Sequence, residues 1–195
     1  MSKPQKTDKK QVPLLALRIC IGVLAFLLYS NTLSHKFTLD DDFFFLKNKA
    51  VAKGVASIGS FFTEGSLEGF SDKQGLQPYR PVTLVSFAIQ KEMTGFKLGP
   101  AHFVNVLLFS FLCILLFNFL LKIFPRSSVW IPAVITSLFL FHPVHTEVVA
   151  SIKSRDELLA ALFGVWSLSI FFGNKLESRS WTRIACSVIL FALAI

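Results

Sequence analysis

Long apolar runs alternate with short polar segments along the whole chain. The runs cover residues 12–33, 103–124, 129–141, 158–172 and 184–195. A helix needs about 20 apolar residues to cross the hydrocarbon core of a bilayer. The first two runs have this length, and the fourth approaches it if its first turn begins near Arg155. The pattern predicts an all-α polytopic membrane protein with a first transmembrane helix over 12–33 and helices two to five over 101–195.

The third and fifth runs are shorter than a full crossing. The third has 13 residues, so a crossing must include Ser127 and Ser128 or continue into the polar HPVHTE motif. The fifth stops after 12 residues. We therefore expect an amino-terminal fragment of a larger protein, truncated in its fifth span and inactive by itself.

A hydrophilic segment over residues 34–100 separates the first two runs. Between residues 31 and 100, eight Lys and Arg nearly balance seven Asp and Glu. Long connections of this kind tend to be functional. Two amphipathic stretches, IGSFF and VTLVSFAIQKEM, predict short helices on the membrane surface rather than a disordered linker.

The basic residues predict the orientation. The tail over 1–11, the nearby Arg18 and the connections after the second and fourth runs hold ten Lys and Arg against two Asp and Glu. The positive-inside rule places these segments in the cytoplasm. The 34–100 segment and HPVHTE then face the opposite side, in a bacterial inner membrane or an endoplasmic reticulum membrane.

Composition and charge placement narrow the class further. The chain is 53% hydrophobic and 16% charged, whereas a soluble domain is about a quarter charged. The net charge is +8, but the basic residues sit at the ends of apolar runs and not in a stripe with aromatics, so we expect no nucleic-acid partner. Three cysteines lie inside apolar runs, which predicts neither a disulfide framework nor a metal site.

The stretch TLDDDFFFLKN places Asp40, Asp41 and Asp42 just after the first run. Adjacent carboxylates repel, and partial burial raises a carboxyl pKa. Such a group suits a general base acting on a hydroxyl, or a metal site; a solvated helix end is the alternative. We interpret the phenylalanines as the membrane-facing half of a surface helix whose acids face the site.

Two later motifs carry further candidates. HPVHTE offers His142, His145 and Glu147, which could bind a metal, share a proton or hold a phosphate, or could simply start an interfacial helix. SIKSRDELLA follows with Arg155 and Asp156. On one continuous helix Glu147 and Arg155 would point about 80° apart and could face one pocket, and arginine suits phosphate.

Two more motifs flank the second run. QPYRPVT holds Arg80 between Tyr79 and a proline that restricts the backbone. This rigidity suits a cation held in a site, and an interfacial anchor is the alternative. AHFVNV places His102 and Asn105 on one face of a helix, as a site or as a helix-to-helix hydrogen bond.

Taken in order, FTLDDDFFFLKN, PYRPVTLVSF, GPAHFVNVLL and FHPVHTEVVASIKSRDELLAALF resemble the amino-terminal part of GT-C class membrane glycosyltransferases. The closest resemblance is to transmembrane O-mannosyltransferases that carry tetratricopeptide repeats, and to their bacterial relatives. It covers residues 37–172, and no 34-residue repeat is visible. It implies a GT-C-like bundle and an inverting transfer of a sugar, with mannose among the candidates, from a polyprenyl-phosphate donor to a hydroxyl of a protein or another acceptor.

The resemblance also implies roles by position. Asp41, with its neighbour Asp40, would be the catalytic carboxylate. The donor and its phosphate would meet Arg80, Arg155, His145, Glu147 and His142, and the supporting positions would be Tyr79, Asn48, His102, Asn105 and Asp156. Leu39 stands where the family commonly has an aromatic residue. Many members of the class work without a metal, so we expect no metal and no cofactor.

Two alternatives stay open. A transporter segment would place its polar groups near mid-membrane, whereas here nearly all cluster at one predicted surface and only Asn118 lies deep. A non-catalytic membrane scaffold with a degenerate site is the other alternative, against which the presence of all four motifs weighs.

Overall fold

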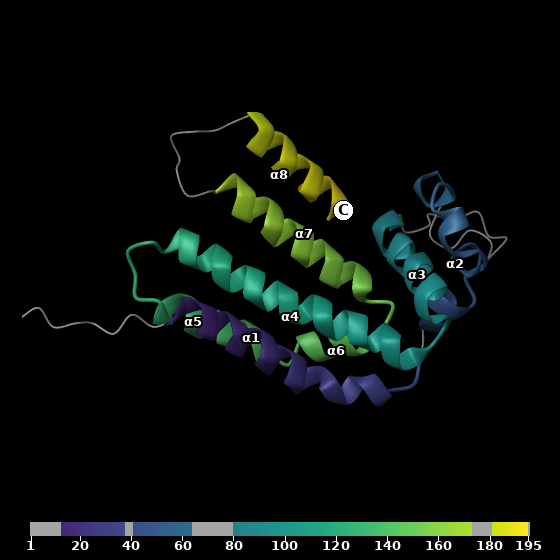
Figure 1. The fold of residues 1–195 in the computed structure, drawn as a ribbon, viewed down its shortest axis with the longest axis horizontal. Helices are drawn as coiled ribbons and strands as arrows, with labels where there is room; N and C mark the ends of the chain where they lie inside the picture. Colours follow the sequence, from purple (N-terminus) through teal and green to yellow (C-terminus); the bar gives the residue numbers. More distant parts are fainter. Residues whose placement is uncertain (1–12, 38–40, 64–79, 173–180, 195) are drawn as a thin grey trace, which may run out of the picture.

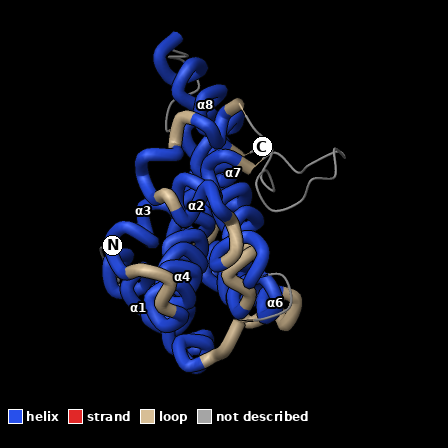
Figure 2. The backbone as a smooth tube through the Cα atoms, turned by 90° about the vertical axis from the view of Figure 1, so that its right-hand side faces the viewer, coloured by secondary structure: helices blue, strands red, loops and turns tan. Residues whose placement is uncertain are grey.

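The computed structural model describes residues 13–37, 41–63, 80–172 and 181–194 of the chain. In these ranges the regular structure is helical, without a strand (Figures 1 and 2). In order, the elements are α1 (Leu14–Tyr29), η1 (Ser30–Ser34), η2 (Asp42–Leu46), α2 (Lys49–Ala52), η3 (Gly54–Ser57), η4 (Ser60–Phe62), α3 (Pro81–Thr94), α4 (Leu98–Ile123), α5 (Trp130–Leu140), α6 (His145–Ala150), α7 (Arg155–Phe171) and α8 (Trp181–Leu193). Asp40 and Tyr79 lie outside the described residues.

Four long helices form a row in the order α1, α4, α7 and α8 (Figure 1), each packed against the next. A core of apolar side chains joins α1 and α4 to α5, α6 and α7. Tyr29 and Phe109, for example, meet edge to face with ring centroids 5.1 Å apart. α7 and α8 add a polar contact, in which the Ser167 hydroxyl donates to the Ser187 carbonyl at 2.8 Å.

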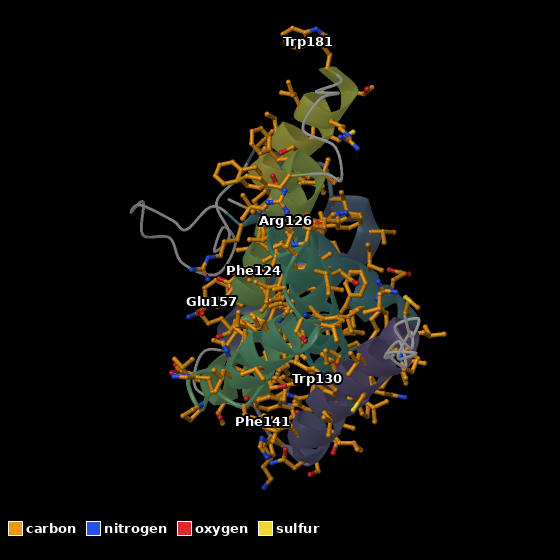
Figure 3. All side chains as sticks on the ribbon, turned by 90° about the vertical axis from the view of Figure 1, so that its left-hand side faces the viewer. Phe124, Arg126, Trp130, Phe141, Glu157 and Trp181 are labelled. Atoms are coloured by element: carbon orange, nitrogen blue, oxygen red, sulfur yellow. The ribbon has the colours of Figure 1, made fainter. Side chains whose placement is uncertain are left out.

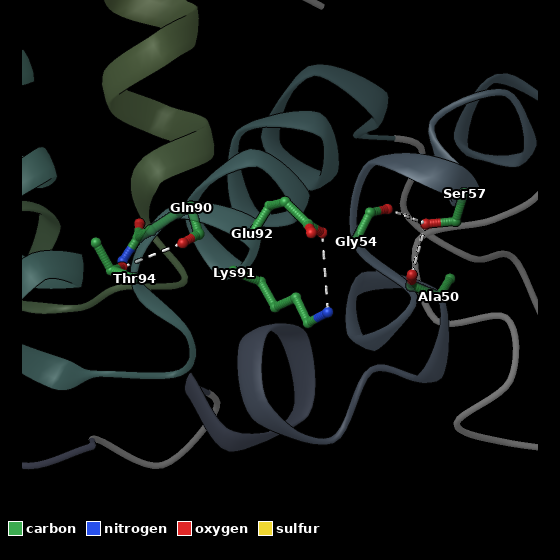
Figure 4. Close-up of polar contacts among 7 residues, drawn as sticks. All are labelled: Ala50, Gly54, Ser57, Gln90, Lys91, Glu92 and Thr94. Carbon is green, nitrogen blue, oxygen red and sulfur yellow. Dashed lines mark hydrogen bonds and ion pairs between the residues drawn. The ribbon is translucent and has the colours of Figure 1, made fainter.

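A second, smaller core lies at one end of this row, where α1 ends and α4 begins (Figure 1). It is built by η2, α2, η4 and α3 together with the start of α4 and residue Ile152. Polar contacts within these short helices hold the backbone (Figure 4): the Ser57 hydroxyl donates to the carbonyls of Ala50 at 2.6 Å and Gly54 at 2.8 Å. We call this group of helices, η2 to α3, the cap.

The cap contains helices at both stretches where amphipathic pattern predicted them. The last three residues of IGSFF form η4, and VTLVSFAIQKEM forms most of α3. α3 begins with Pro81 at its first position, where a missing backbone N–H removes no helical hydrogen bond.

The interpretation of the phenylalanines as membrane-facing is wrong for Phe45. Its side chain is fully buried in the cap core. Its ring lies 5.3 Å from that of Phe87 and 5.2 Å from that of Phe96, centroid to centroid. η2 is a single π-helical turn, and aromatic partners from α3 and the α3–α4 turn offer Phe45 a protein interior. Sequence pattern alone could not distinguish that interior from lipid.

Two helices of the described residues are long and apolar enough to cross a membrane. One continues from α1 through η1, over Leu14–Ser34, and the other is α4, over Leu98–Ile123. α4 begins five residues before the predicted span. Pro100 lies in its first turn, where proline is tolerated because its nitrogen needs no helical partner. α5 has 11 residues and α8 has 13, so each covers only about 15–20 Å.

Many large apolar side chains point away from the cores. Leu138 is 70% exposed and Trp181 is 85% exposed. Trp130 and Phe141 are also exposed, and Figure 3 shows Trp181 at one extremity of the molecule. Together with two helices of membrane-spanning length, this outer surface is consistent with an all-α membrane protein. The five-span GT-C-like bundle stays a prediction.

Candidate functional site

Asp41 lies fully buried where the cap meets the connection between α6 and α7. Its Oδ1 accepts a hydrogen bond from the Ser151 hydroxyl at 3.1 Å and another from the Lys153 backbone N–H at 2.8 Å. The chain leaves helical geometry over residues 151–154, so these groups are available to a partner outside the helices. The α6–α7 connection thus supplies two hydrogen-bond donors to the Asp41 carboxylate.

Arg155 begins α7 and is also fully buried. Its Nε donates to Asn105 Oδ1 at 2.8 Å, its Nη2 to the Ala101 carbonyl at 3.0 Å, and its Nη1 to the Ser86 hydroxyl at 3.4 Å. The guanidinium carbon lies 4.6 Å from the centroid of the Phe87 ring. Burial of a cation is costly unless hydrogen bonds compensate it, and here three donor atoms have partners.

Asn105 joins the two charged residues. Its Nδ2 donates to the Ser151 carbonyl at 2.7 Å while its Oδ1 accepts from Arg155. We call the set Asp41, Ser151, Asn105 and Arg155 the buried polar network. Asp41 and Arg155 also attract one another electrostatically. The network therefore ties the start of η2 to α4 and to the start of α7.

His102 lies one turn before Asn105 on α4 and is fully buried. Its ring centroid is 6.2 Å from that of His35. The expected pairing of His102 and Asn105 on one face is thus found, with both facing the interior of the protein.

Arg80 and Asp156 form an ion pair between the starts of α3 and α7. The Arg80 side chain is 34% exposed and that of Asp156 is 10% exposed. A small pocket of about 60 Å³ lies beside this pair, bounded by α3, α7 and the end of α8. Of the two candidate arginines, Arg80 is the one that solvent reaches.

The HPVHTE residues lie in different surroundings from Asp41. His142 and Glu147 are exposed, and His142 Nδ1 accepts from the Val144 N–H at 3.2 Å. His145 is half-buried, with its ring centroid 4.3 Å from Phe139 and 5.4 Å from Phe109. Burial lowers the pKa of His145, and the neighbouring His142 lowers it further.

Glu147 and Arg155 do not lie on one continuous helix, so the arrangement in which both face one pocket at about 80° is not found. α6 ends at Ala150, and α7 begins at Arg155 after a non-helical connection. Glu147 is exposed while Arg155 points inward. The hydrogen bonds from Ser151 and Lys153 to Asp41, a residue far away in the sequence, compensate for those that a continuous helix would make.

Asn48 has a local role. Its side-chain Oδ1 accepts from the backbone N–H groups of Ala50 and Val51, both at 3.0 Å, and so caps the start of α2. Among the described residues no group of three or more His, Cys, Asp or Glu is placed to hold a metal ion.

Sequence reasoning missed Ser151, Ser86, Phe87 and the Lys153 backbone as partners of the candidate residues. The available signal was the polar SIKS stretch between two apolar segments. It indicates a helix break. It does not show which distant side chain accepts hydrogen bonds from the groups that the break leaves without helical partners.

Comparison with known proteins gives three instructive relatives. The chain is 28% identical over 170 residues to human protein O-mannosyl-transferase TMTC3, covering 85% of this chain and 18% of the relative. It is 32% identical over 166 residues to human protein O-mannosyl-transferase TMTC2, covering 82% and 19%. It is 27% identical over 200 residues to mouse protein O-mannosyl-transferase TMTC4, covering 91% and 26%.

No protein-family profile matches the chain. No solved structure matches it either. The chain spans about a fifth of the length of the curated relatives it matches.

These similarities relate the chain to protein glycosyltransferases, and in particular to O-mannosyltransferases. Within that class it is related to the TMTC proteins over most of its own length, which confirms the resemblance seen in the four motifs.

Proposed function

We propose that this chain carries part of the active site of an inverting glycosyltransferase. The enzyme would move a sugar from a polyprenyl-phosphate donor to an acceptor hydroxyl on the extracytoplasmic side of a membrane. Mannose and a protein acceptor are supported by the names of the relatives. One observation carries the proposal: Asp41 accepts hydrogen bonds from Ser151 and Lys153 in the α6–α7 connection. The motif FTLDDDFFFLKN therefore contacts the motif FHPVHTEVVASIKSRDELLAALF in the fold.

Asp41 is the proposed base. Two hydrogen bonds hold its carboxylate in place beside the positive charge of Arg155, where it could take a proton from the acceptor hydroxyl. The acceptor hydroxyl would take the place of the Ser151 hydroxyl at Asp41. Its oxygen would then bond to the anomeric carbon, its proton would pass to Asp41, and the polyprenyl phosphate would leave with the bonding electron pair.

Arg80 is the proposed phosphate ligand. Its partial exposure and its position near the cap allow a phosphate to approach, with Asp156 as the carboxylate that holds the guanidinium beforehand. Arg155 would act from the interior, through the charge that it places near Asp41. His142, His145 and Glu147 would shape the donor side, while Asp40 and Tyr79 are included on the motif match alone.

The extracytoplasmic position has support in the arrangement of the helices. The cap and the α6–α7 connection gather at one end of the helix row, whereas α1 begins at the other end, after the basic tail (Figure 1). A lipid-linked donor suits this location, since its prenyl chain stays in the bilayer while its sugar phosphate meets the cap.

Asp41→Asn tests the proposal in the protein expressed from its complete gene. Transfer of mannose from polyprenyl-phosphate mannose to an acceptor peptide is expected to fall about 100-fold or more, because the amide cannot take a proton. The amide oxygen still accepts hydrogen bonds from Ser151 and Lys153, so the protein should stay folded, with a lower melting temperature because buried Arg155 loses a nearby negative charge.

Glu157→Gln is the matched control, since it neutralises an exposed carboxylate in the same turn as Arg155 (Figure 3). Its activity should equal that of the unmodified protein. Full transfer by a folded Asp41→Asn protein would refute Asp41 as the base.

A further inference from the structure

A large pocket lies at the end of the helix row opposite the cap. Its volume is about 1230 Å³, and α1, α4 and α7 form its walls. It lies where α1 begins and where α4 and α7 end (Figure 1). Cofactor and ligand pockets in proteins usually measure about 300–1,000 Å³, so this pocket has room for a substantial molecule.

Two cations line this pocket, and neutral side chains hold both. Arg18 Nε donates to Asn118 Oδ1 at 2.7 Å. Lys122 Nζ donates to the Ser169 hydroxyl at 2.8 Å and to the Ser169 carbonyl at 3.0 Å. Asn118 and Lys122 are one turn apart on α4, so their side chains share a face.

The described residues do not balance the charge of this pocket. Among them the lining contains no Asp or Glu, and neither Arg18 nor Lys122 pairs with a carboxylate. Two half-buried cations without an acidic partner favour an anion between them. The bonds to Asn118 and Ser169 hold both cations in place before an anion arrives.

The remaining walls are apolar. Leu14, Leu115, Leu121 and Ile170 contribute aliphatic surface, and Trp166 adds an indole ring. α1 and α4 are also the two helices with the length and composition of membrane spans. The occupant should therefore be amphipathic, with a negative head and hydrocarbon chains. A free phosphate would leave the apolar walls uncovered.

We infer that this pocket binds an anionic phospholipid, with the phosphate between Arg18 and Lys122 and the acyl chains along the apolar walls. The site is separate from the proposed transfer site and does not depend on it. Basic side chains near the end of a membrane helix attract anionic lipid. Here the apolar walls of the pocket would also contact the acyl chains.

Native mass spectrometry of the protein expressed from its complete gene tests the site. The protein is exchanged into bicelles that contain equal amounts of phosphatidylglycerol and phosphatidylcholine, and the lipid retained after transfer to detergent is counted. We expect one phosphatidylglycerol to be retained in preference to phosphatidylcholine. Arg18→Gln and Lys122→Gln should each lower this retention about fivefold.

Two controls separate the pocket from general attraction and from misfolding. Arg126→Gln removes the same charge from an exposed position at the same end of the row (Figure 3), and retention should change less than about twofold. Arg18→Lys keeps the charge and should keep the lipid.

Three results would overturn the inference: equal retention of the two lipids, an Arg126→Gln loss as large as the Arg18→Gln loss, or displacement of the lipid by millimolar glycerol phosphate. The last result would assign the pocket to a soluble phosphate. Because transfer is not measured, none of these outcomes depends on the role of Asp41.

Discussion

The carboxylate of Asp41 accepts a hydrogen bond from the backbone N–H of Lys153 at 2.8 Å. This contact joins the first polar segment after α1 to the break between α6 and α7. A backbone donor cannot be removed by a side-chain substitution, so the pairing depends on the path of the chain over residues 151–154. The buried polar network fixes that path through Asn105 and Arg155.

Asn105→Leu should destabilise the protein strongly. The substitution leaves Arg155 Nε and the Ser151 carbonyl without their partner inside the protein. We expect a loss of about 3–5 kcal/mol in the free energy of unfolding, as for a buried charge whose partner is removed. Unfolding in a denaturing detergent measures it. Asn31→Leu, at an exposed position in η1, is the control and should cost less than about 0.5 kcal/mol.

Arg80→Gln should weaken donor use while the protein stays folded. The substitution leaves the largely buried Asp156 carboxylate without this cation, so the melting temperature should fall. The lost phosphate contact should raise the KM for polyprenyl-phosphate sugar about tenfold. The KM for the acceptor should not change. Lys91→Gln is the control, since it removes a cation from the same helix. The Lys91 Nζ lies 3.9 Å from Glu92 Oε2 (Figure 4). If both variants give the same KM for the donor, Arg80 is not the phosphate ligand.

His145 should make the stability depend on pH. Burial and the nearby His142 lower its pKa in the folded protein, so below about pH 6.5 the unfolded chain takes up the proton first. The stabilisation is therefore complete above about pH 6.5 and is lost as the pH falls toward the folded pKa. Melting temperatures between pH 7.5 and pH 5 measure this.

His145→Leu keeps an apolar contact with Phe139 and Phe109 and should flatten the pH profile. His142→Gln, at an exposed position, should flatten it only slightly. An unchanged profile in His145→Leu would assign the pH dependence to other groups.

Phe45→Ala should show that the phenylalanine run serves the protein interior. The ring packs against Phe87 and Phe96 in the cap core, and its loss should cost about 3–5 kcal/mol of unfolding free energy. Phe62→Ala, at a position that is 51% exposed, should cost far less. Equal melting temperatures for the two variants would place Phe45 outside the core.

The sequence by itself determined the long apolar helices and their order. Apolar runs of fixed length, with charges at their ends, are local properties, and they predicted α1, α4, α5, α7 and α8 to within a few residues. The motifs also predicted the relationship to O-mannosyltransferases. Four short segments in a given order can be recognised in one sequence without a structure.

Only the tertiary structure decided which polar residues meet. An acid can cap any nearby backbone N–H, and a phenylalanine can face lipid or protein with the same local pattern. The structure pairs Asp41 with Lys153 and Ser151, turns Arg155 inward and buries Phe45. Each outcome depends on contacts between segments that lie far apart in the sequence, where the free energy of burial is set by the partner and not by the residue alone.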